Sequence, residues 1–376
     1  MRFLKGPGGR GVLLCLAWLC LTHLLAEAAA RLPFPVESPW SSGLAKGPAL
    51  ARFDAGWYGS IAESGYSMDP AGGQSNVAFF PLYPLLIRAL TATGISFAHA
   101  GLAISFVALL SAARLLAKAE GNAALDGLGA IVALLAWPAS FFLASVYTES
   151  LFLALALVAF RSAEGRKWGP AALAGFLAGL ARPNGFLVTL LVAPQAFAEW
   201  QRGPRTTGTA WKAVATALAP IAGLATFLSF LWIRFGDPLA CFRALSAWGR
   251  VPGQSGAHLL GRIRDMAERL LGIQAGYGLV EALELGTVAL FAVLTLLLFR
   301  ARRLSEGLYS AGVLSVAVLN GSLAGAHRYV LVLFPCFALL GELLGRSRTA
   351  LVLYVFMGAG LGVTLLTRFV LWVFVG

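Results

Sequence analysis

Apolar runs close to 20 residues long recur along the whole chain and constrain its fold more than any other feature. A helix needs about 20 apolar residues to cross ~30 Å of hydrocarbon. The 376 residues are 59% hydrophobic and only 12% charged, whereas a soluble domain carries about 25% charged residues. The runs lack the period-two alternation of an outer-membrane barrel. The sequence therefore predicts an all-α, polytopic membrane protein.

The apolar runs predict about eleven membrane spans in a single domain, residues 1–376. The expected spans are 11–29, 98–117, 127–145, 147–160, 170–182, 185–199, 213–234, 277–299, 308–325, 329–344 and 350–374. The first run also fits a cleaved signal peptide, with a basic start, an apolar core and AEAAA as the cleavage site, which would leave ten spans. GxxxG spacings at Gly175–Gly179 and Gly341–Gly345 predict close helix packing.

Charge in the short loops predicts the orientation of the helices. If the amino terminus is cytoplasmic, every short cytoplasmic loop carries at least two basic residues, with Arg114 at the end of its span counted, as the positive-inside rule requires. The net charge of +12 then orients helices, and no basic tract with interleaved aromatic residues indicates a nucleic-acid partner. Residues 30–97 become the first extracytoplasmic loop, and residues 235–276 become a second long extracytoplasmic segment.

Cysteine and histidine give no indication of a metal or a disulfide framework. Three of the four cysteines lie in apolar runs, and the fourth, Cys241, stands alone. The four histidines are scattered and form no HExxH pair. We therefore expect neither a metal nor any other cofactor.

Six polar or aromatic clusters fall on the outer side in this topology. They are RFDAGWY (52–58), NVAFFPLYP (76–84), VYTES (146–150), ARPNG (181–185), FGDPLACFRALSAWGR (235–250) and AHRYV (326–330). Polar groups near a membrane are costly unless they line a wet cavity or a site. The clusters therefore predict one shared site at the outer face.

Asp54 is the candidate catalytic residue. A lone acid in an outer loop is usually only solvated, but this one lies among aromatic residues of the kind that settle at the headgroup level. Trp57 and Ile61 fall on one helical face, as in a short helix that lies along the membrane interface. An acid held at that boundary would meet a lipid-borne substrate.

Other polar residues have a structural interpretation beside a functional one. Glu149 either suits the positive end of a helix dipole or hydrogen-bonds a sugar. Arg182 and Asn184 follow a helix break in ARPNG, where the guanidinium either binds a phosphate or pairs with Asp54 or Glu149. Asp237 fits a helix N-cap with a proline at the first helical position, which alone explains it.

Arg328 either snorkels to the interface or binds phosphate, and His327 beside it is more often structural than catalytic. With these alternatives open, thirteen residues are candidates for substrate binding. They are Arg52, Trp57, Tyr58, Asn76, Tyr83, Tyr147, Glu149, Arg182, Asn184, Asp237, Arg250, His327 and Arg328.

Taken in order, the motifs resemble a known family. RFDAGWYGSIAESGY, SNVAFFPLYPLL, YTESLFLAL, ARPNGFL, GDPLACF, AWGR and RYVLVLFPCF look like the bacterial members of the PIG-V family. That family includes the second mannosyltransferase of GPI-anchor assembly and belongs to the GT-C class of membrane glycosyltransferases. The resemblance implies a GT-C-like fold, a sugar donor on a polyprenyl phosphate, usually mannose, and a catalytic acid in the first outer loop. Asp54 matches that position.

The resemblance also bears on the metal, the acceptor and the compartment. GT-C enzymes often carry paired acids in this loop, but Phe53 and Ala55 flank Asp54 here, which favours an inverting, metal-independent displacement. GPI itself is eukaryotic, so a bacterial chain would use another glycan, lipid or protein as acceptor. The expected location is the bacterial inner membrane, with the site on the extracytoplasmic face.

Two other classes of function compete with the transferase. A multi-pass transporter or lipid flippase would show inverted repeats and polar groups at the midplane, and the chain shows neither. A non-catalytic scaffold for another membrane enzyme is the third possibility, because no single motif is decisive alone.

Overall fold

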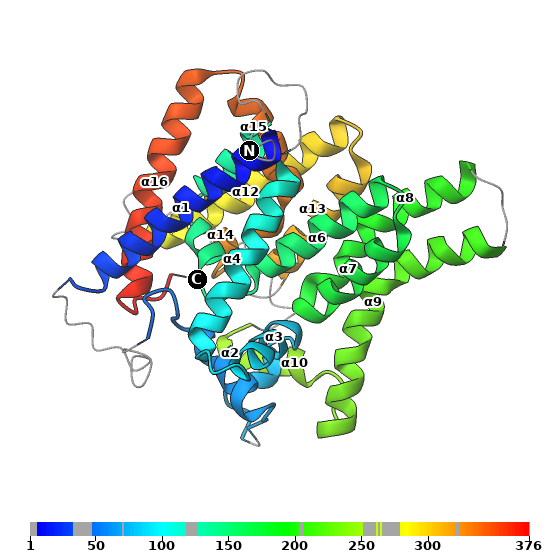
Figure 1. Cartoon of the computed structure of the whole chain (residues 1–376), viewed down its shortest axis with the longest axis horizontal. Helices are drawn as coiled ribbons and strands as arrows, with labels where there is room; N and C mark the ends of the chain where they lie inside the picture. Colours follow the sequence, from blue (N-terminus) through cyan, green and yellow to red (C-terminus); the bar gives the residue numbers. More distant parts are fainter. Residues whose placement is uncertain are drawn as a thin grey trace.

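The computed structural model describes residues 6–32, 47–69, 71–117, 127–202, 207–250, 279–319 and 323–375, together with residues 261 and 264. These residues form helices joined by turns and contain no strand (Figure 1). The all-α prediction is confirmed. Most of the carboxyl-terminal half of the predicted second long segment, 235–276, lies outside the described residues.

Five helices are long and apolar enough to cross a membrane: Pro7–Ala29 (α1), Phe97–Leu116 (α4), Ala210–Phe235 within α9 (Thr207–Phe235), Val280–Arg300 within α12 (Leu279–Arg300) and Arg348–Val370 (α16). A pair of segments bent by 90°, Ala326–Val332 and Phe334–Leu344, would make a sixth span. The described residues thus form a polytopic membrane protein, and the predicted count of eleven spans stays a prediction.

Shorter helices complete the chain. They are α2 (Asp54–Ser64), η2 (Asn76–Ala78), α3 (Leu82–Thr91), α5 (Gly129–Leu135), η3 (Ser140–Ala144), α6 (Glu149–Glu164), α7 (Trp168–Ala181), η4 (Pro183–Val188), α8 (Thr189–Arg202), α10 (Ala240–Ala244), η5 (Leu245–Trp248), α13 (Leu304–Leu319), α14 (Ala326–Tyr329), η6 (Val330–Val332) and α15 (Phe334–Leu344). Helices α2, α3 and α10 gather at one end of the molecule (Figure 1).

The predicted span 127–145 is wrong as one continuous helix. Helix α5 ends at Leu135, and a turn and the 3₁₀ helix η3 follow. Pro138 has no N–H to donate to a continuing helix. Trp137 instead donates its Nε1–H to the carbonyl of His327 at 2.8 Å, so the break ties this segment to α14. An apolar run alone does not reveal such a break.

The α6–α7 hairpin connects the two ends of the molecule. Its 16 and 14 residues correspond to about 24 Å and 21 Å of helix at 1.5 Å per residue. Helix α7 packs closely on α9: a Cβ on Gly179 would collide with the carbonyl oxygen of Pro220. The predicted packing role of the Gly175–Gly179 pair is confirmed. Glu149 and Arg182 thus lie at one end of the hairpin, and the α6–α7 turn lies at the other.

Candidate active site

Asp54 is the first residue of α2, and its direction is fixed by the residue before it. Phe53 has a φ of 49°, in the left-handed region that non-glycine residues rarely adopt. Its ring packs against Phe369, Trp372 and Phe374 from the carboxyl-terminal segment, with ring centroids 5.3–6.1 Å apart. Strained residues of this kind persist where the surroundings over-determine them. This packing holds the start of α2 and turns the Asp54 carboxylate toward α14.

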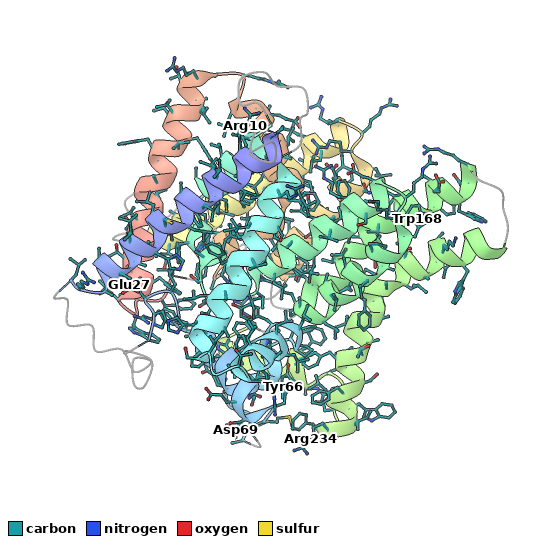
Figure 2. All side chains as sticks on the ribbon, viewed as in Figure 1. Arg10, Glu27, Tyr66, Asp69, Trp168 and Arg234 are labelled. Atoms are coloured by element: carbon teal, nitrogen blue, oxygen red, sulfur yellow. The ribbon has the colours of Figure 1, made fainter. Side chains whose placement is uncertain are left out.

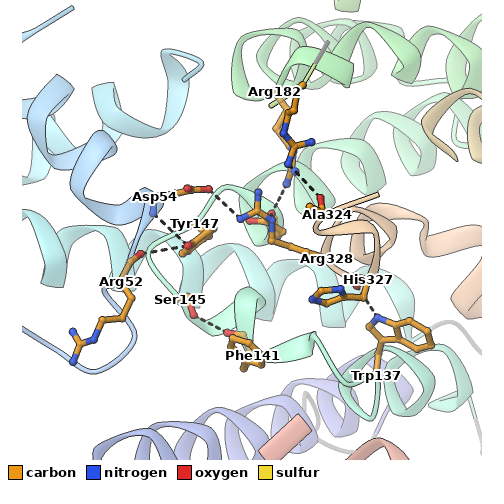
Figure 3. Close-up of polar contacts among 12 residues, drawn as sticks. Arg52, Asp54, Trp137, Phe141, Ser145, Tyr147, Arg182, Ala324, His327 and Arg328 are labelled. Atoms are coloured by element: carbon orange, nitrogen blue, oxygen red, sulfur yellow. Dashed lines mark hydrogen bonds and ion pairs between the residues drawn. The ribbon is translucent and has the colours of Figure 1, made fainter. Parts of the chain in front are cut away.

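The Asp54 carboxylate forms an ion pair with a residue 274 positions away. Arg328 Nη1 donates to Asp54 Oδ2 at 3.0 Å (Figure 3). The Asp54 side chain is 26% exposed, whereas that of Arg328 is 10% exposed. Among the described residues no hydrogen bond to Asp54 Oδ1 is found. One carboxylate oxygen is therefore held by the arginine, and the other forms no hydrogen bond within the described part of the chain.

Glu149 forms ion pairs with two arginines of the same cluster, Arg182 and the Arg328 already described. Its Oε1 lies 2.9 Å from Arg182 Nη1 and 3.4 Å from Arg328 Nε. The Glu149 side chain is 1% exposed and that of Arg182 8%. Each charge taken out of water at this depth needs a partner. Glu149, at the start of α6, thereby holds the guanidinium groups that arrive from the end of α7 and from α14.

Three guanidinium groups surround one aromatic ring. The Cζ atoms of Arg182, Arg250 and Arg328 lie 5.9, 5.1 and 5.2 Å from the ring centroid of Tyr329. Arg250 also donates through Nη2 to the carbonyl of Ala324 at 3.3 Å. Three arginines against the two carboxylates of the cluster leave 3 − 2 = +1. The cluster thus has one positive charge more than its own acids neutralise.

Tyr147 joins the cluster to the first loop. Its hydroxyl accepts from the backbone N–H of Asp54 and donates to the carbonyl of Arg52, both at 3.3 Å. The Arg328 guanidinium lies 5.2 Å from the Tyr147 ring and 5.3 Å from the Phe142 ring. Cation–π contacts of this kind are favourable for a desolvated guanidinium. The tyrosine therefore supports both partners of the Asp54–Arg328 pair.

An aromatic cluster begins one helical turn beyond Asp54. Trp57 stacks on Phe79 with centroids 5.8 Å apart, and Trp248 meets both rings edge-on. Tyr58 contacts Phe79 from the side. Burial raises the pKa of the Tyr58 phenol above its ordinary value, and the charges of nearby acids raise it further. Trp248 precedes Arg250 by two residues, so the aromatic cluster and the arginine cluster are neighbours.

Arg52 faces away from this cluster. Its Nε donates to the carbonyl of Val370 at 3.2 Å and its Nη1 to that of Pro48 at 2.9 Å, while its guanidinium lies 5.1 Å from the ring of Trp372. Figure 3 shows the side chain directed away from Arg328. Burial lowers the pKa of the Arg52 guanidinium, and the charge of Glu27 raises it. In this structure Arg52 holds the first loop to the carboxyl-terminal segment.

Two further candidates are bound into the fold of the first loop. Asn76 Oδ1 accepts from the Ser67 N–H at 2.8 Å, and its Nδ2 donates to the carbonyl of Gly65 at 3.0 Å. Tyr83 is fully buried, and its hydroxyl donates to the carbonyl of Gly101 at 2.8 Å. Both side chains use their polar atoms within the protein.

The three remaining candidates are Asn184, His327 and Asp237. Asn184 is buried just after Arg182, and its Oδ1 has no hydrogen-bond partner among the described residues. The fully buried His327 imidazole lies beside Trp137 (Figure 3). Asp237 Oδ1 accepts from the Leu239 N–H and from Arg243 Nη2, both at 2.9 Å. The helix there begins at Ala240, two residues later than the sequence predicted.

Sequence reasoning missed Tyr329 and Phe142, the rings against which the arginines pack. Tyr329 adjoins Arg328 in the motif AHRYV, which was the available signal. Phe142 lies in the broken span, where the apolar pattern hides it.

Glu149 Oε2 and Arg250 Nη1 are among the buried polar atoms of the site that have no hydrogen-bond partner in the described part of the chain. Buried polar atoms normally have a partner, so a carboxylate acceptor and a guanidinium donor are available for a polar, anionic ligand. Within the described residues no group of three His, Cys, Asp or Glu side chains is arranged to hold a metal ion.

The described residues thus form a helical membrane protein with a buried cluster of arginines and acids at one end. The family model described as mannosyltransferase (PIG-V) matches residues 19–199. Over these residues the chain is similar to the PIG-V mannosyltransferase family, and the protein is a glycosyltransferase that acts on mannose. The match includes Asp54, Glu149 and Arg182 and ends before Arg250 and Arg328. No curated protein matches the chain.

Proposed function

We propose that the protein transfers mannose from a polyprenyl-phosphate donor to an extracytoplasmic glycan, lipid or protein acceptor. The observation that carries this proposal is the placement of Asp54 against the surplus positive charge of the arginine cluster. A phosphate is the anion that the planar guanidinium fork fits best. A carboxylate within reach of that phosphate has the position of a general base.

Asp54 would accept the proton of the acceptor hydroxyl on Oδ1, the oxygen that Arg328 leaves available. The acceptor oxygen forms a bond to the anomeric carbon as the bond from that carbon to the phosphate oxygen breaks, and the configuration inverts. The electron pair of the broken bond stays on the lipid phosphate. A well-placed general base contributes about 10²–10⁴-fold to the rate.

The arginines would stabilise the charge that grows on the leaving phosphate. Arg182 and Arg328 are held by Glu149, so they are oriented before the substrate arrives, and such preorganisation is what makes electrostatic stabilisation effective. Arg250 has no carboxylate partner among the described residues, and its Nη1 is unpaired. Arg250 is therefore the guanidinium that the phosphate would engage most directly.

The aromatic cluster would receive the lipid. Trp57, Phe79 and Trp248 are only partly buried, and aromatic side chains suit the boundary between lipid and water. The polyprenyl chain would pass these rings and enter the bilayer between helices. Asn184, which lies buried beside Arg182, would contact the sugar or the phosphate.

The basic loops support an orientation with the amino terminus in the cytoplasm and the Asp54 end outside. The bacterial resemblance supports the inner membrane as the location. The single acid between Phe53 and Ala55 supports a displacement without a metal.

Reconstitution of the full chain in vesicles with polyprenyl-phosphate-mannose and a panel of acceptors tests the proposal. Released polyprenyl phosphate is measured for the wild type, Asp54→Asn and Asp237→Asn. We expect Asp54→Asn to lose about 10²–10⁴-fold of the transfer rate. Asp237→Asn is a matched control, because that acid pairs with Arg243 outside the cluster, and it should transfer normally. Normal transfer by Asp54→Asn would remove Asp54 from the mechanism.

A further inference from the structure

A cavity with several charged residues in its lining lies at the end of the molecule opposite Asp54. Its volume is about 570 Å³. It is lined by the end of α6, the start of α7, the end of α8 and the turn between α12 and α13; the charged lining residues are Glu164, Arg166, Glu199, Arg202, Arg302 and Arg303. Nothing in the transfer mechanism uses these residues.

The cavity is one helix length from the candidate active site. Helix α6 begins at Glu149 in the arginine cluster and ends at Glu164 in the cavity, and 16 residues correspond to about 24 Å. Trp168 marks the cavity end and lies far from Tyr66 and Asp69 of the first loop (Figure 2). A ligand in the cavity would not touch Asp54.

The charges of the cavity leave positive groups for a ligand. Four arginines and two glutamates give 4 − 2 = +2. Arg166 pairs with Glu199 at 3.2 Å, and Arg303 pairs with Glu306 and with Glu342. Arg202 and Arg302 form no ion pair with the described residues. At least two guanidinium groups in the lining are thus not neutralised by the carboxylates around them.

Two of the arginines occupy a backbone conformation that normally favours glycine. Arg166 has a φ of 56° and Arg302 a φ of 57°. Each lies in a turn that directly follows a helix, and the two turns are of the same kind. The N–H of Arg166 donates to the carbonyl of Ala163, and the N–H of Arg302 donates to the carbonyl of Phe299. The left-handed residue after a helix is usually glycine, because a side chain there is unfavourable.

The orientation of helices by positive charge does not explain why arginine occupies this position in both turns. A positive charge that only orients the helices is effective anywhere in a short loop, so it does not require the strained position. Both strained arginines line the same cavity, although the two turns are 136 positions apart (302 − 166). Because both side chains line one cavity, they could contact the same ligand.

We propose that this cavity binds the phosphate of an anionic phospholipid head group. Guanidinium groups recognise phosphate through paired N–H donors, and basic pockets between membrane helices bind anionic head groups. Leu304 lines the cavity and is 57% exposed, so an apolar surface for the acyl chains adjoins the charges. A free phosphate compound has the same recognition chemistry, and the test separates the two sources.

The test uses the full chain in nanodiscs and does not depend on the transfer reaction. Thermal midpoints are measured in phosphatidylcholine alone, in phosphatidylcholine with phosphatidylglycerol, and in phosphatidylcholine with inorganic phosphate at matched ionic strength. We expect phosphatidylglycerol to raise the wild-type midpoint, because a ligand that binds only the folded state stabilises it. The paired variant Arg166→Gln with Arg302→Gln should lose this rise.

Two further variants decide between interpretations. Arg346→Gln with Arg348→Gln removes two exposed charges from another turn, between α15 and α16, and should keep the full rise. Arg166→Gly with Arg302→Gly relieves the strain while removing the charges, so it should remain folded and also lose the rise. A rise with inorganic phosphate that only the cavity variants lose would identify a free phosphate ligand instead of the lipid. No wild-type rise in either arm, or an equal rise in the cavity variants, would overturn the proposal.

Discussion

The two ends of the α6–α7 hairpin both carry arginines and acids, yet they use them differently. At the Asp54 end, ion pairs join residues from distant parts of the chain, with Asp54 and Arg328 separated by 274 positions. At the other end, Arg161 pairs with Glu164 and Arg303 with Glu306, each within one helical turn, beside two longer-range pairs, Arg166 with Glu199 and Arg303 with Glu342. The local pairs follow from helix geometry alone, whereas the distant pairs exist only because the fold brings them together.

Burial separates the two ends more clearly than sequence distance does. Glu149 and Arg182 are 1% and 8% exposed, against 35% and 20% for Glu164 and Arg161. An exposed pair contributes about 0–1 kcal/mol, whereas removing one partner of a buried pair costs about 3–5 kcal/mol. Replacing an arginine by glutamine should therefore lower the free energy of unfolding much more at the Asp54 end than at the other end.

The largest effect is expected from Arg328→Gln. It leaves Asp54 and Glu149 with one guanidinium fewer, so the free energy of unfolding should fall by about 3–5 kcal/mol. Mannose transfer should fall as well, because the base loses the group that orients it. Thermal or denaturant unfolding and the vesicle assay measure the two effects.

Arg243→Gln is the matched control for that variant. Arg243 is 70% exposed and pairs with Asp237, so its replacement should change stability by no more than about 1 kcal/mol. If Arg243→Gln and Arg328→Gln lowered the free energy of unfolding equally, burial would not determine how much an ion pair contributes to stability in this protein.

A smaller and more selective effect is expected from Arg250→Gln. Arg250 has no carboxylate partner in the described chain, and its main contacts are with Tyr329 and the carbonyl of Ala324. Stability should therefore change little, while the KM for the polyprenyl-phosphate donor rises about tenfold, the equivalent of 1.4 kcal/mol. Donor titrations in the vesicle assay check this. An unchanged KM would remove Arg250 from the phosphate site.

The smallest effect is expected at the other end of the hairpin. Arg161→Gln breaks an i,i+3 pair with Glu164, so the loss of stability should be below about 1 kcal/mol and mannose transfer should be normal. Unfolding curves and transfer rates measure both. A loss of transfer like that of Arg328→Gln would show that the two ends of the hairpin are coupled.

Much of the helical pattern was predictable because the apolar runs are long. The span expected at 98–117 is Phe97–Leu116, and that expected at 277–299 is Leu279–Arg300. The break after Leu135 was predictable only in part: Pro138 was a visible signal for it, whereas the hydrogen bond from Trp137 to His327 that ties the broken segment to α14 was not. Hydropathy reports burial in the membrane and carries no information about such contacts.

The site was predictable in its parts and less so in its pairings. From the sequence, the partner of Arg182 could be a phosphate, Asp54 or Glu149, and in the structure it is Glu149. Asn76 and Tyr83 looked like ligand contacts because they are polar residues in an aromatic loop, but their hydrogen bonds are internal. Composition indicates that a polar group has a partner and does not say which.

The most direct test of the account measures donor binding and single-turnover release of polyprenyl phosphate on the same Asp54→Asn protein. Replacing the carboxylate raises the net charge of the cluster from +1 to +2, so the anionic donor should bind as tightly as to the wild type or more tightly. Release should nevertheless fall by about 10²–10⁴-fold, because the base is gone. Loss of donor binding together with release would mean that Asp54 only supports the fold, and release at the wild-type rate would contradict its role in mannose transfer.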